Sequence, residues 1–140
     1  MSEENTGFQL KDSGERQEFS TGAQRDIQQG KGRFDLLSPV ALRRLAIIME
    51  RGAIKYECRN WERGMPLSRF MDSAIRHLMQ LLDGMDDEDH AGQALFNIMG
   101  YIHTEHRIKN GQLPKELDDM PREKNLQLEI DKLYKDRVKE

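Results

Sequence analysis

The stretch from Gly52 to Phe70 concentrates side chains that could recognise a charged ligand with a flat ring. It holds the only tryptophan of the chain among cations, amides and a tyrosine. Clustered cations repel one another unless an anion lies between them, and an uncovered aromatic ring favours a partner on which to stack. A phosphorylated nucleoside meets both needs. We therefore interpret this stretch as part of a nucleotide site, whose candidate residues are Lys55, Tyr56, Arg59, Asn60 and Trp61.

Cations and glycines also alternate in residues 21–35. Glycine lets a backbone approach a phosphate closely, and arginine presents a planar fork that binds a phosphate in two places. The pattern favours a phosphate clamp made of Arg25, Lys31 and Arg33. The alternative, which spacing alone slightly favours, is that these cations form local turns or pair with other parts of the fold. The segment has no P-loop motif.

Several carboxylates could hold a hard divalent cation against phosphates. Mg²⁺ and Mn²⁺ prefer oxygen ligands, and facing helices of a bundle can direct carboxylates at one ion. If the chain is an enzyme, the expected catalytic residues are Glu88, Asp89 and Glu62. The expected metal ligands are Glu88, Asp89 and Asp72. The acids of residues 86–89 have a second explanation, because acids at the start of a helix complement the positive end of its dipole.

Other chemistries are poorly supported by the sequence. The four histidines do not follow the HExxH spacing of zinc hydrolases, and Cys58 is the only cysteine. A structural zinc site and a disulfide framework are therefore not expected. His103 and His106 are expected to lie exposed near a helix end.

Composition limits the compartment and the partners. A lone thiol fits a reducing cytoplasm, and no leader or membrane-spanning segment is expected from the apolar pattern. The net charge of −3 gives no global attraction to nucleic acid. We expect a cytoplasmic protein whose partners include neither long nucleic acid nor membrane.

The elements that must position these residues read as helices throughout. Ser38 and Pro39 form a helix start, and apolar residues then recur at helical spacing to about residue 56. A second helix opens at Pro66 or Ser68, and the acids of residues 86–89 start a third. The expected apolar stripes are Leu42, Leu45, Ala46, Met49 and Ala53; Met71, Ala74, Ile75, Leu78 and Leu82; and Ala91, Ala94, Leu95, Ile98 and Ile102.

The predicted fold class is all-α, with no strand or hairpin signal anywhere. It is a compact helical bundle with an extended N-terminal arm and a C-terminal amphipathic helix. We predict a flexible arm in residues 1–20, a helical nucleotide-binding domain in 21–121, and a packing or oligomerisation helix in 122–140. Because the chain is short and rich in charge, its core is small, and a homo-oligomer that shares a core between subunits is expected.

Two helix faces carry polar residues of interest. On the second helix, Asp72 and Arg76 are four residues apart and suited to an ion pair, with His77 beside them. This face is expected to be solvated unless Arg76 or His77 turns inward. On the third helix, His90 and Asn97 share a face, and Asn97 lies among apolar residues. The Asn97 amide is expected to bond to a neighbouring helix or to contact the ligand.

Several motifs occur in one order over residues 21–121: TGAQRD, GKGRFDLLSP, RGAIKYECRNWERGMPLSRF, SAIRHLMQLLDG, DEDHAGQALFN and LPKELDDMP. This order resembles a phage-borne family labelled dATP/dGTP diphosphohydrolase N-terminal domain. The resemblance implies a relative of the all-α nucleotide pyrophosphatases, which use divalent cations and are often oligomeric. Matching positions that would contact the nucleotide are Arg25, Asp26, Lys31, Arg33, Asp35, Lys55, Tyr56, Arg59, Asn60, Trp61, Glu62, Arg76, His77, Glu88, Asp89, His90 and Asn97.

Two functions remain open. The first is a phage-encoded purine (d)NTP diphosphohydrolase of the host cytoplasm that uses Mg²⁺ or Mn²⁺ and releases a nucleoside monophosphate. The second is a metal-independent nucleotide sponge that sequesters a host immune-signalling nucleotide. The chain lacks the ExxE and ExxD pairs that the all-α pyrophosphatases carry on successive helices, and its recurring polar residues are more often cations or amides.

Overall fold

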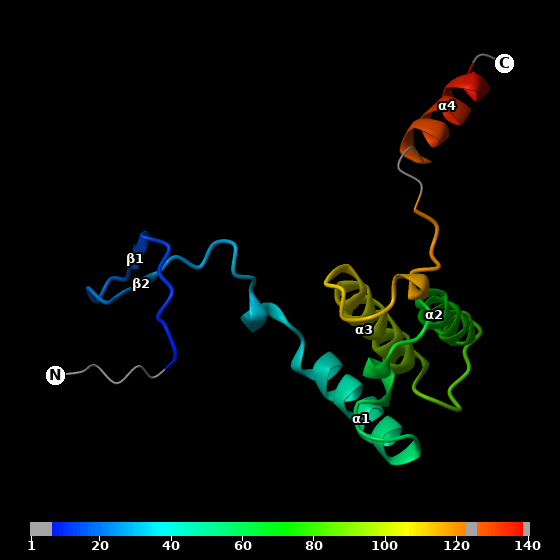
Figure 1. Ribbon diagram of the computed structural model, residues 1–140, viewed down its shortest axis with the longest axis horizontal. Coiled ribbons are helices and arrows are strands. Elements are labelled where there is room, and N and C mark those ends of the chain that lie inside the picture. The colour runs from blue at the N-terminus through cyan, green and yellow to red at the C-terminus, as the bar shows by residue number, and fades with distance from the viewer. Residues whose placement is uncertain (1–6, 123–125, 139–140) are drawn as a thin grey trace. The chain divides into compact units, whose positions relative to one another are not determined.

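The computed structural model describes residues 7–122 and 126–138, and its chain divides into two units, Met1–Ser38 and Pro39–Glu140 (Figure 1). Parts of the expected arm (residues 1–6) and of the expected C-terminal helix (residues 123–125 and 139–140) lie outside the described residues.

The first unit contains a short antiparallel hairpin. Strands β1 (Arg16–Glu18) and β2 (Gln24–Asp26) pair with Gln17 opposite Arg25. The turn between them is closed by the Gly22 N–H, which donates to the Phe19 carbonyl, and Gly22 has a φ of 84° that suits glycine. A short 3-10 helix, η1 (Phe34–Leu36), follows. The expectation of no strand was wrong, because three-residue polar strands carry no apolar alternation to detect.

The second unit is helical, which confirms the predicted all-α class. It contains α1 (Pro39–Lys55), α2 (Leu67–Leu82), α3 (His90–Lys109) and α4 (Leu126–Val138), with 3-10 turns η2 (Asn60–Arg63) and η3 (Lys115–Leu117). Helix α3 begins after the acidic run and not within it, because the Asp89 side chain caps it by accepting from the Gly92 N–H.

Helix α3 is the centre of the bundle, since α1, α2, η2 and η3 all contact it. Its close approach to α2 depends on Gly100, against which the Phe70 ring packs. The buried side chains of α2 are Leu67, Phe70, Ala74 and His77, and the buried residues of α3 are His90, Gly92, Ala94, Asn97, Gly100, Thr104 and Ile108.

The expected apolar stripes are only partly buried. Ala74 and Ala94 belong to the core, whereas Leu42, Ile75, Leu78, Leu82, Leu95, Ile98 and Ile102 are exposed. The stripe predicted for α3 was wrong because small and polar residues take the buried face, where helices approach closely enough to exclude larger side chains. No helix in the described ranges is long and apolar enough to cross a membrane.

Candidate functional site

A cavity of about 720 Å³ opens within the helical unit, between the C-terminal part of α1, the following connection, α2 and the start of α3. Its predicted members are Lys55, Tyr56, Arg59, Asn60, Trp61, Arg76, His77, Glu88, Asp89 and Asn97. The structure therefore brings together at one hollow most of the residues singled out from four separate segments of the sequence.

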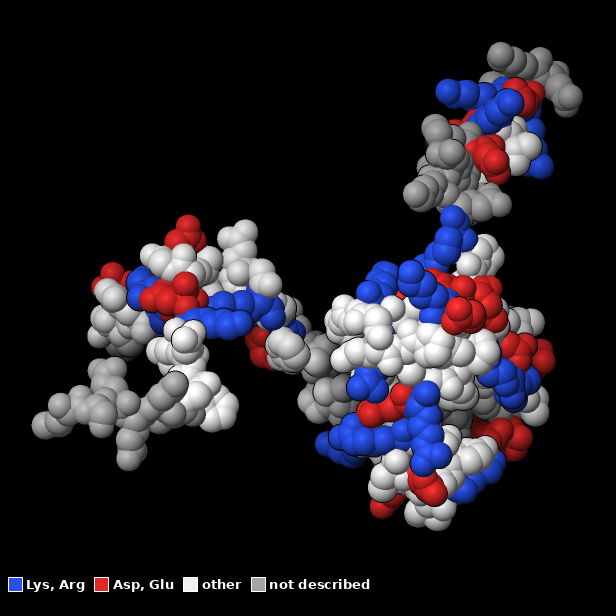
Figure 2. All heavy atoms as spheres, viewed as in Figure 1, with Lys and Arg blue, Asp and Glu red and all other residues white. Residues whose placement is uncertain are grey.

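Three cations on the cavity wall form no ion pair with any carboxylate in the described part of the chain: Arg51, Lys55 and Arg76. All three are exposed, and Arg76 donates to the Ser73 hydroxyl, at 3.3 Å. On the face shown in Figure 2, cations and carboxylates lie side by side over the helical unit. These three side chains thus offer positive charge to an anion that enters the cavity.

Arg59 is held differently from the other cations. It has a φ of 62°, which makes it the one residue other than glycine with positive φ among the described residues. Its guanidinium Nη1 lies 2.6 Å from Oε1 of Glu62, whose side chain is 18% exposed. Glu62, a predicted catalytic residue, does not line the cavity and serves to position Arg59.

The two aromatic residues of the connection have different surroundings. The Trp61 ring packs edge-on against Phe96 and His103, with centroids 6.3 Å and 4.9 Å away. Tyr56 is 59% exposed, and the Lys55 ammonium lies 5.1 Å from its ring centroid. Of the two, Tyr56 offers the more accessible ring. The expectation that His103 is exposed was wrong, because Trp61 covers it; His106 is exposed as expected.

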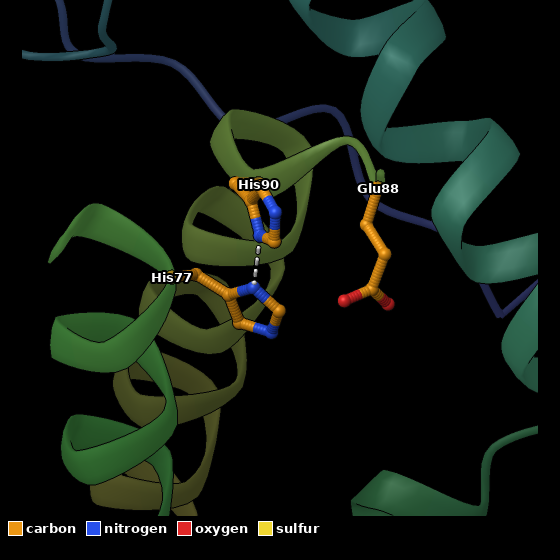
Figure 3. Close-up of side chains that lie close together, drawn as sticks. All are labelled: His77, Glu88 and His90. Atoms are coloured by element: carbon orange, nitrogen blue, oxygen red, sulfur yellow. Dashed lines mark hydrogen bonds between the residues drawn. The ribbon is translucent and has the colours of Figure 1, made fainter. Parts of the chain in front are cut away.

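Two buried histidines, His77 of the cavity lining and His90, lie against each other (Figure 3). His77 and His90 are 6% and 1% exposed, and their Nδ1 atoms lie 3.0 Å apart. The Nε2 atom of His90 is 2.7 Å from Oδ1 of Asp87. Burial lowers the pKa of His77 below its ordinary value, so the ring is neutral at physiological pH. His77, unlike its neighbour Arg76, has turned away from the solvated face of α2.

Glu88 and Asp89 differ in how they are engaged. Asp89 caps α3 and binds the Arg44 guanidinium through both carboxylate oxygens, and the Arg44 hydrogen bond lowers its pKa to about 2. The Glu88 side chain is exposed and makes no hydrogen bond or ion pair with any described residue. Figure 3 shows its carboxylate directed toward the two histidines.

Asp72 and Asn97 complete the predicted set from the helices. Asp72 lies outside the cavity lining and pairs with Arg69 at 3.0 Å, so the expected pair with Arg76 was wrong. Asn97 is 6% exposed, and its amide donates to the Gln93 carbonyl of its own helix at 2.8 Å, where a bond to a neighbouring helix was expected.

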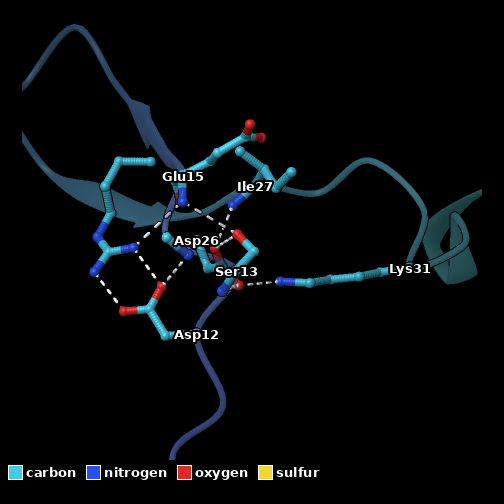
Figure 4. Close-up of polar contacts among 8 residues, drawn as sticks. Asp12, Ser13, Glu15, Asp26, Ile27 and Lys31 are labelled. Atoms are coloured by element: carbon cyan, nitrogen blue, oxygen red, sulfur yellow. Dashed lines mark hydrogen bonds and ion pairs between the residues drawn. The ribbon is translucent and has the colours of Figure 1, made fainter.

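The cations of the expected phosphate clamp belong to the first unit, and two of them pair locally. Lys31 lies 2.9 Å from Asp26, whose carboxylate also accepts from Ser13 and the Ile27 N–H (Figure 4). These bonds, that of Ser13 first, hold the Asp26 pKa well below its usual range. Arg33 makes two hydrogen bonds of 2.8 Å to Asp35, whereas Arg25 lies exposed on β2. The role of the three cations in phosphate binding stays a prediction.

Sequence reasoning missed Arg51 and Gln93, both of which line the cavity. Helical spacing could have found them. Arg51 lies one turn before Lys55, and Gln93 one turn before Asn97, so each falls on a face already marked.

The carboxylates expected to bind Mg²⁺ or Mn²⁺ fit such an ion only in part. Asp72 lies outside the cavity and Asp89 is engaged by Arg44, which leaves Glu88 as the available ligand. Mg²⁺ is often held by one or two carboxylates together with water and substrate phosphates. One unengaged carboxylate among the expected ligands is therefore compatible with an ion that arrives with a nucleotide.

A family model described as dATP/dGTP diphosphohydrolase, N-terminal, matches residues 21–113, which is more than half of the chain. The chain belongs to this family. The match covers strand β2 of the hairpin and all of the cavity residues, and it confirms the resemblance found in the motifs. Searches of the curated proteins and of the solved structures return no match. The name of the dATP/dGTP diphosphohydrolase family supports a nucleotide hydrolase-like protein acting on purine deoxynucleotides.

Proposed function

We propose that the protein binds a purine deoxynucleoside triphosphate in this cavity and hydrolyses it to the monophosphate and pyrophosphate. One observation carries the proposal: a single hollow is lined by an exposed aromatic ring and by cations and a carboxylate that have no ion-pair partner within residues 7–122 and 126–138. A volume of about 720 Å³ falls within the range of small-ligand sites. The family name supports the choice of dATP or dGTP.

Different side chains bind the phosphates and the base of the nucleotide. Arg51, Lys55 and Arg76 bind the phosphates and neutralise the negative charge that grows as the reaction proceeds. The Tyr56 ring stacks on the base, since base–aromatic stacking needs one accessible face. Glu62 positions the guanidinium of Arg59 at the edge of the same hollow.

In the proposed reaction, the oxygen of a water molecule bonds to the α-phosphorus, and the bond from this phosphorus to the bridging oxygen of the β-phosphate breaks. Pyrophosphate leaves, and the protons of the water pass to solvent. Mg²⁺ or Mn²⁺ would supply charge stabilisation on the phosphoryl oxygens, with Glu88 as its protein ligand. Asp89 contributes indirectly, because it caps the N-terminus of α3 beside the site.

A second function, sequestration without turnover, is favoured by the engagement of two of the three expected metal ligands. Asp72 pairs with Arg69 and Asp89 with Arg44, whereas the cations remain available. Several charge-assisted hydrogen bonds can retain a nucleotide without a metal. The ligand would then be a host signalling nucleotide, and the protein a phage-encoded sponge of the host cytoplasm.

Product analysis separates the two functions. Purified protein is incubated with dGTP, dATP, and cyclic and ADP-ribose-type nucleotides, in Mg²⁺ or in EDTA, and the nucleotides are then recovered by heat and separated by anion exchange. Metal-dependent formation of dGMP or dAMP is the expected result. Intact nucleotide recovered after tight binding in EDTA would instead establish sequestration, and failure to bind any of them would overturn both functions.

A matched pair of variants tests the phosphate cations. We expect Lys55→Ala to raise the Kd for dGTP about tenfold or more, because a hydrogen bond to a charged group contributes roughly 1.5–3 kcal/mol. Lys109→Ala, on the exposed end of α3, is the control and should leave the Kd unchanged. Equal Kd values for the two variants in calorimetry would remove Lys55 from the site.

A further inference from the structure

The two buried histidines form a donor set together with Glu88, and the nucleotide chemistry above uses Glu88 but neither histidine. One ring nitrogen of each histidine and a carboxylate oxygen of Glu88 lie within 4.8 Å of one another. His77 comes from α2, Glu88 from the connection before α3, and His90 from the first residue of α3 (Figure 3). We propose that these three residues bind a divalent transition-metal ion of the imidazole-preferring class, such as Zn²⁺, Co²⁺ or Ni²⁺.

The spacing of the imidazoles suits one ion between them. Two nitrogens that each lie about 2.1 Å from one ion, at right or tetrahedral angles, are about 3.0–3.4 Å apart. The Nδ1 atoms of His77 and His90 are 3.0 Å apart. Without an ion, the His77 Nδ1–H donates to His90 Nδ1; when an ion binds, His77 carries its proton on Nε2 and both Nδ1 lone pairs face the metal.

Asp87 supplies the support that a metal-binding histidine ordinarily has. A ligating imidazole usually donates its other N–H to a carboxylate or carbonyl, which fixes the tautomer and strengthens the ligand. His90 Nε2 has such a partner in Asp87 at 2.7 Å. Because this bond places the His90 proton on Nε2, its Nδ1 is left as a lone-pair donor. Asp87 is a positioning residue for the ion.

Glu88 provides the third ligand and the cavity provides the open position. Its side chain is exposed and makes no hydrogen bond to any residue that the structure describes, so a rotation can bring an oxygen into contact with the ion. His77 and Glu88 both line the cavity, whereas His90 is not a lining residue and its ring packs against that of His77. A site with three protein ligands and one face open to a cavity is of the kind that takes water or a substrate oxygen in the remaining position.

The choice of ion follows from the donor atoms. Imidazole nitrogen suits Zn²⁺, Co²⁺ and Ni²⁺, whereas Mg²⁺ takes oxygen ligands and keeps its water. The inference does not depend on the proposed function, because it concerns the ion and the protein alone. If both hold, a nucleotide phosphate is the group that meets the open position.

The test uses the full chain, stripped of metal with a chelator and free of nucleotide. Zn²⁺ is titrated by calorimetry, and Co²⁺ is followed by its visible absorption. We expect one ion per chain, and long-range ¹H–¹⁵N spectra of the Zn²⁺ form should show the Nδ1 atoms of both buried histidines coordinated. His77→Ala and His90→Ala should abolish binding, with circular dichroism reporting whether each variant folds.

If the histidine variants do not fold, substitutions at two exposed positions still test the proposal. Asp87→Asn retains an acceptor for His90 but loses its charge, and should weaken Zn²⁺ binding about 10- to 100-fold. Glu88→Gln should weaken it by at least as much. Asp86→Asn and His106→Ala are the matched controls and should bind as the parent does.

The proposal is overturned if Zn²⁺ and Co²⁺ do not bind, if Asp87→Asn and Glu88→Gln bind as the parent does, or if His106→Ala loses the ion. Hydrolysis of dGTP in Mg²⁺ by a protein that binds no Zn²⁺ would remove the metal site alone. Zn²⁺ binding by a protein that neither binds nor hydrolyses dGTP would remove the proposed function alone.

Discussion

Tyr56 and Trp61 lie five residues apart in one connection, but the structure gives them separate tasks. The Trp61 ring is used in packing against Phe96 and His103, and the Tyr56 ring is 59% exposed. Sequence alone treats the two as equivalent aromatic candidates, because both are flanked by cations. Which ring has a free face depends on contacts with α3, more than thirty residues later in the chain.

This difference predicts opposite effects for two substitutions. Tyr56→Ala should leave the melting temperature near that of the parent and weaken dGTP binding, because stacking on one base contributes about 1–3 kcal/mol. Trp61→Ala should lower the melting temperature, because it leaves a hole against α3. Thermal unfolding and calorimetry of both variants provide the measurement. A stable Trp61→Ala that binds poorly, beside a Tyr56→Ala that binds well, would assign the base to the indole.

At the scale of single elements, the packing of α2 on α3 is set by Gly100. A Cβ atom added at this position would come within 2.5 Å of the Phe70 ring, which is itself buried. We expect Gly100→Ala to lower the free energy of unfolding by about 1–3 kcal/mol, as overpacking does. The midpoint of urea unfolding gives the measurement.

Gly52 in α1 is the matched control. A Cβ atom there meets nothing within 4 Å, so Gly52→Ala should raise stability by up to about 1 kcal/mol through helix propensity alone. If Gly100→Ala proved as stable as Gly52→Ala, the close approach of α2 and α3 would not exist in solution.

The N-terminus of α2 is capped from a distant part of the chain. Asp119, in the segment after η3, accepts from the backbone N–H of Ser68 at 2.9 Å and from its hydroxyl. These bonds lower the pKa of Asp119 below its ordinary value of 3.8. The stabilisation is therefore present at neutral pH and is lost as the pH falls below about 4 and through the folded-state pKa.

Asp119→Ala should accordingly lower the melting temperature at pH 7, and the difference from the parent should shrink as the solution is acidified to pH 3. Glu116→Ala, an exposed acid three residues earlier, is the control and should change the melting temperature little at either pH. A deficit in Asp119→Ala that stayed constant from pH 7 to pH 3 would show that its charge contributes nothing.

The sequence predicted the helices well and their buried faces poorly. Ser38, Pro39 and Gly84 mark helix ends by local rules, so α1 and α2 are found to within a residue or two. Burial depends on what each face meets. Gly100 is buried because Phe70 of α2 lies against it, and the spacing of residues in α3 does not indicate this. The same holds for the site. Residue types around 52–63 indicated a nucleotide, because that signal is local in the sequence. The contact between His77 and His90 could not be predicted, because the two residues are thirteen apart and lie on different helices.

For the molecule as a whole, the exposed apolar surface of α3 has a further implication. Leu95, Ile98 and Ile102 lie on the outside of the bundle, and together with Leu45, Met99, His103 and His106 they line a second hollow of about 540 Å³. Exposed apolar groups of this extent favour association. The occupant we propose is a second copy of the chain, as expected for a domain whose own core is small.

Sedimentation velocity tests this assembly. The parent should sediment at a multiple of the 16.4 kDa chain mass, and Ile98→Glu should shift it toward the monomer because a buried charge at an interface is costly. Glu50→Lys, at an exposed position of α1 that does not line the second hollow, is the control for a change of charge and should leave the sedimentation unchanged. A parent that sediments as a monomer at every concentration would exclude the assembly.

At Arg59 the backbone conformation and the ligand site favour different amino acids. Glycine, asparagine and aspartate adopt its left-handed backbone conformation most readily. Binding of an anion in the cavity, in contrast, favours the guanidinium of arginine. In a saturation library, selection for foldedness and selection for ligand retention would enrich different amino acids at this codon. The difference between the two enrichments would measure how much backbone strain the protein tolerates in order to keep a positive charge at this position.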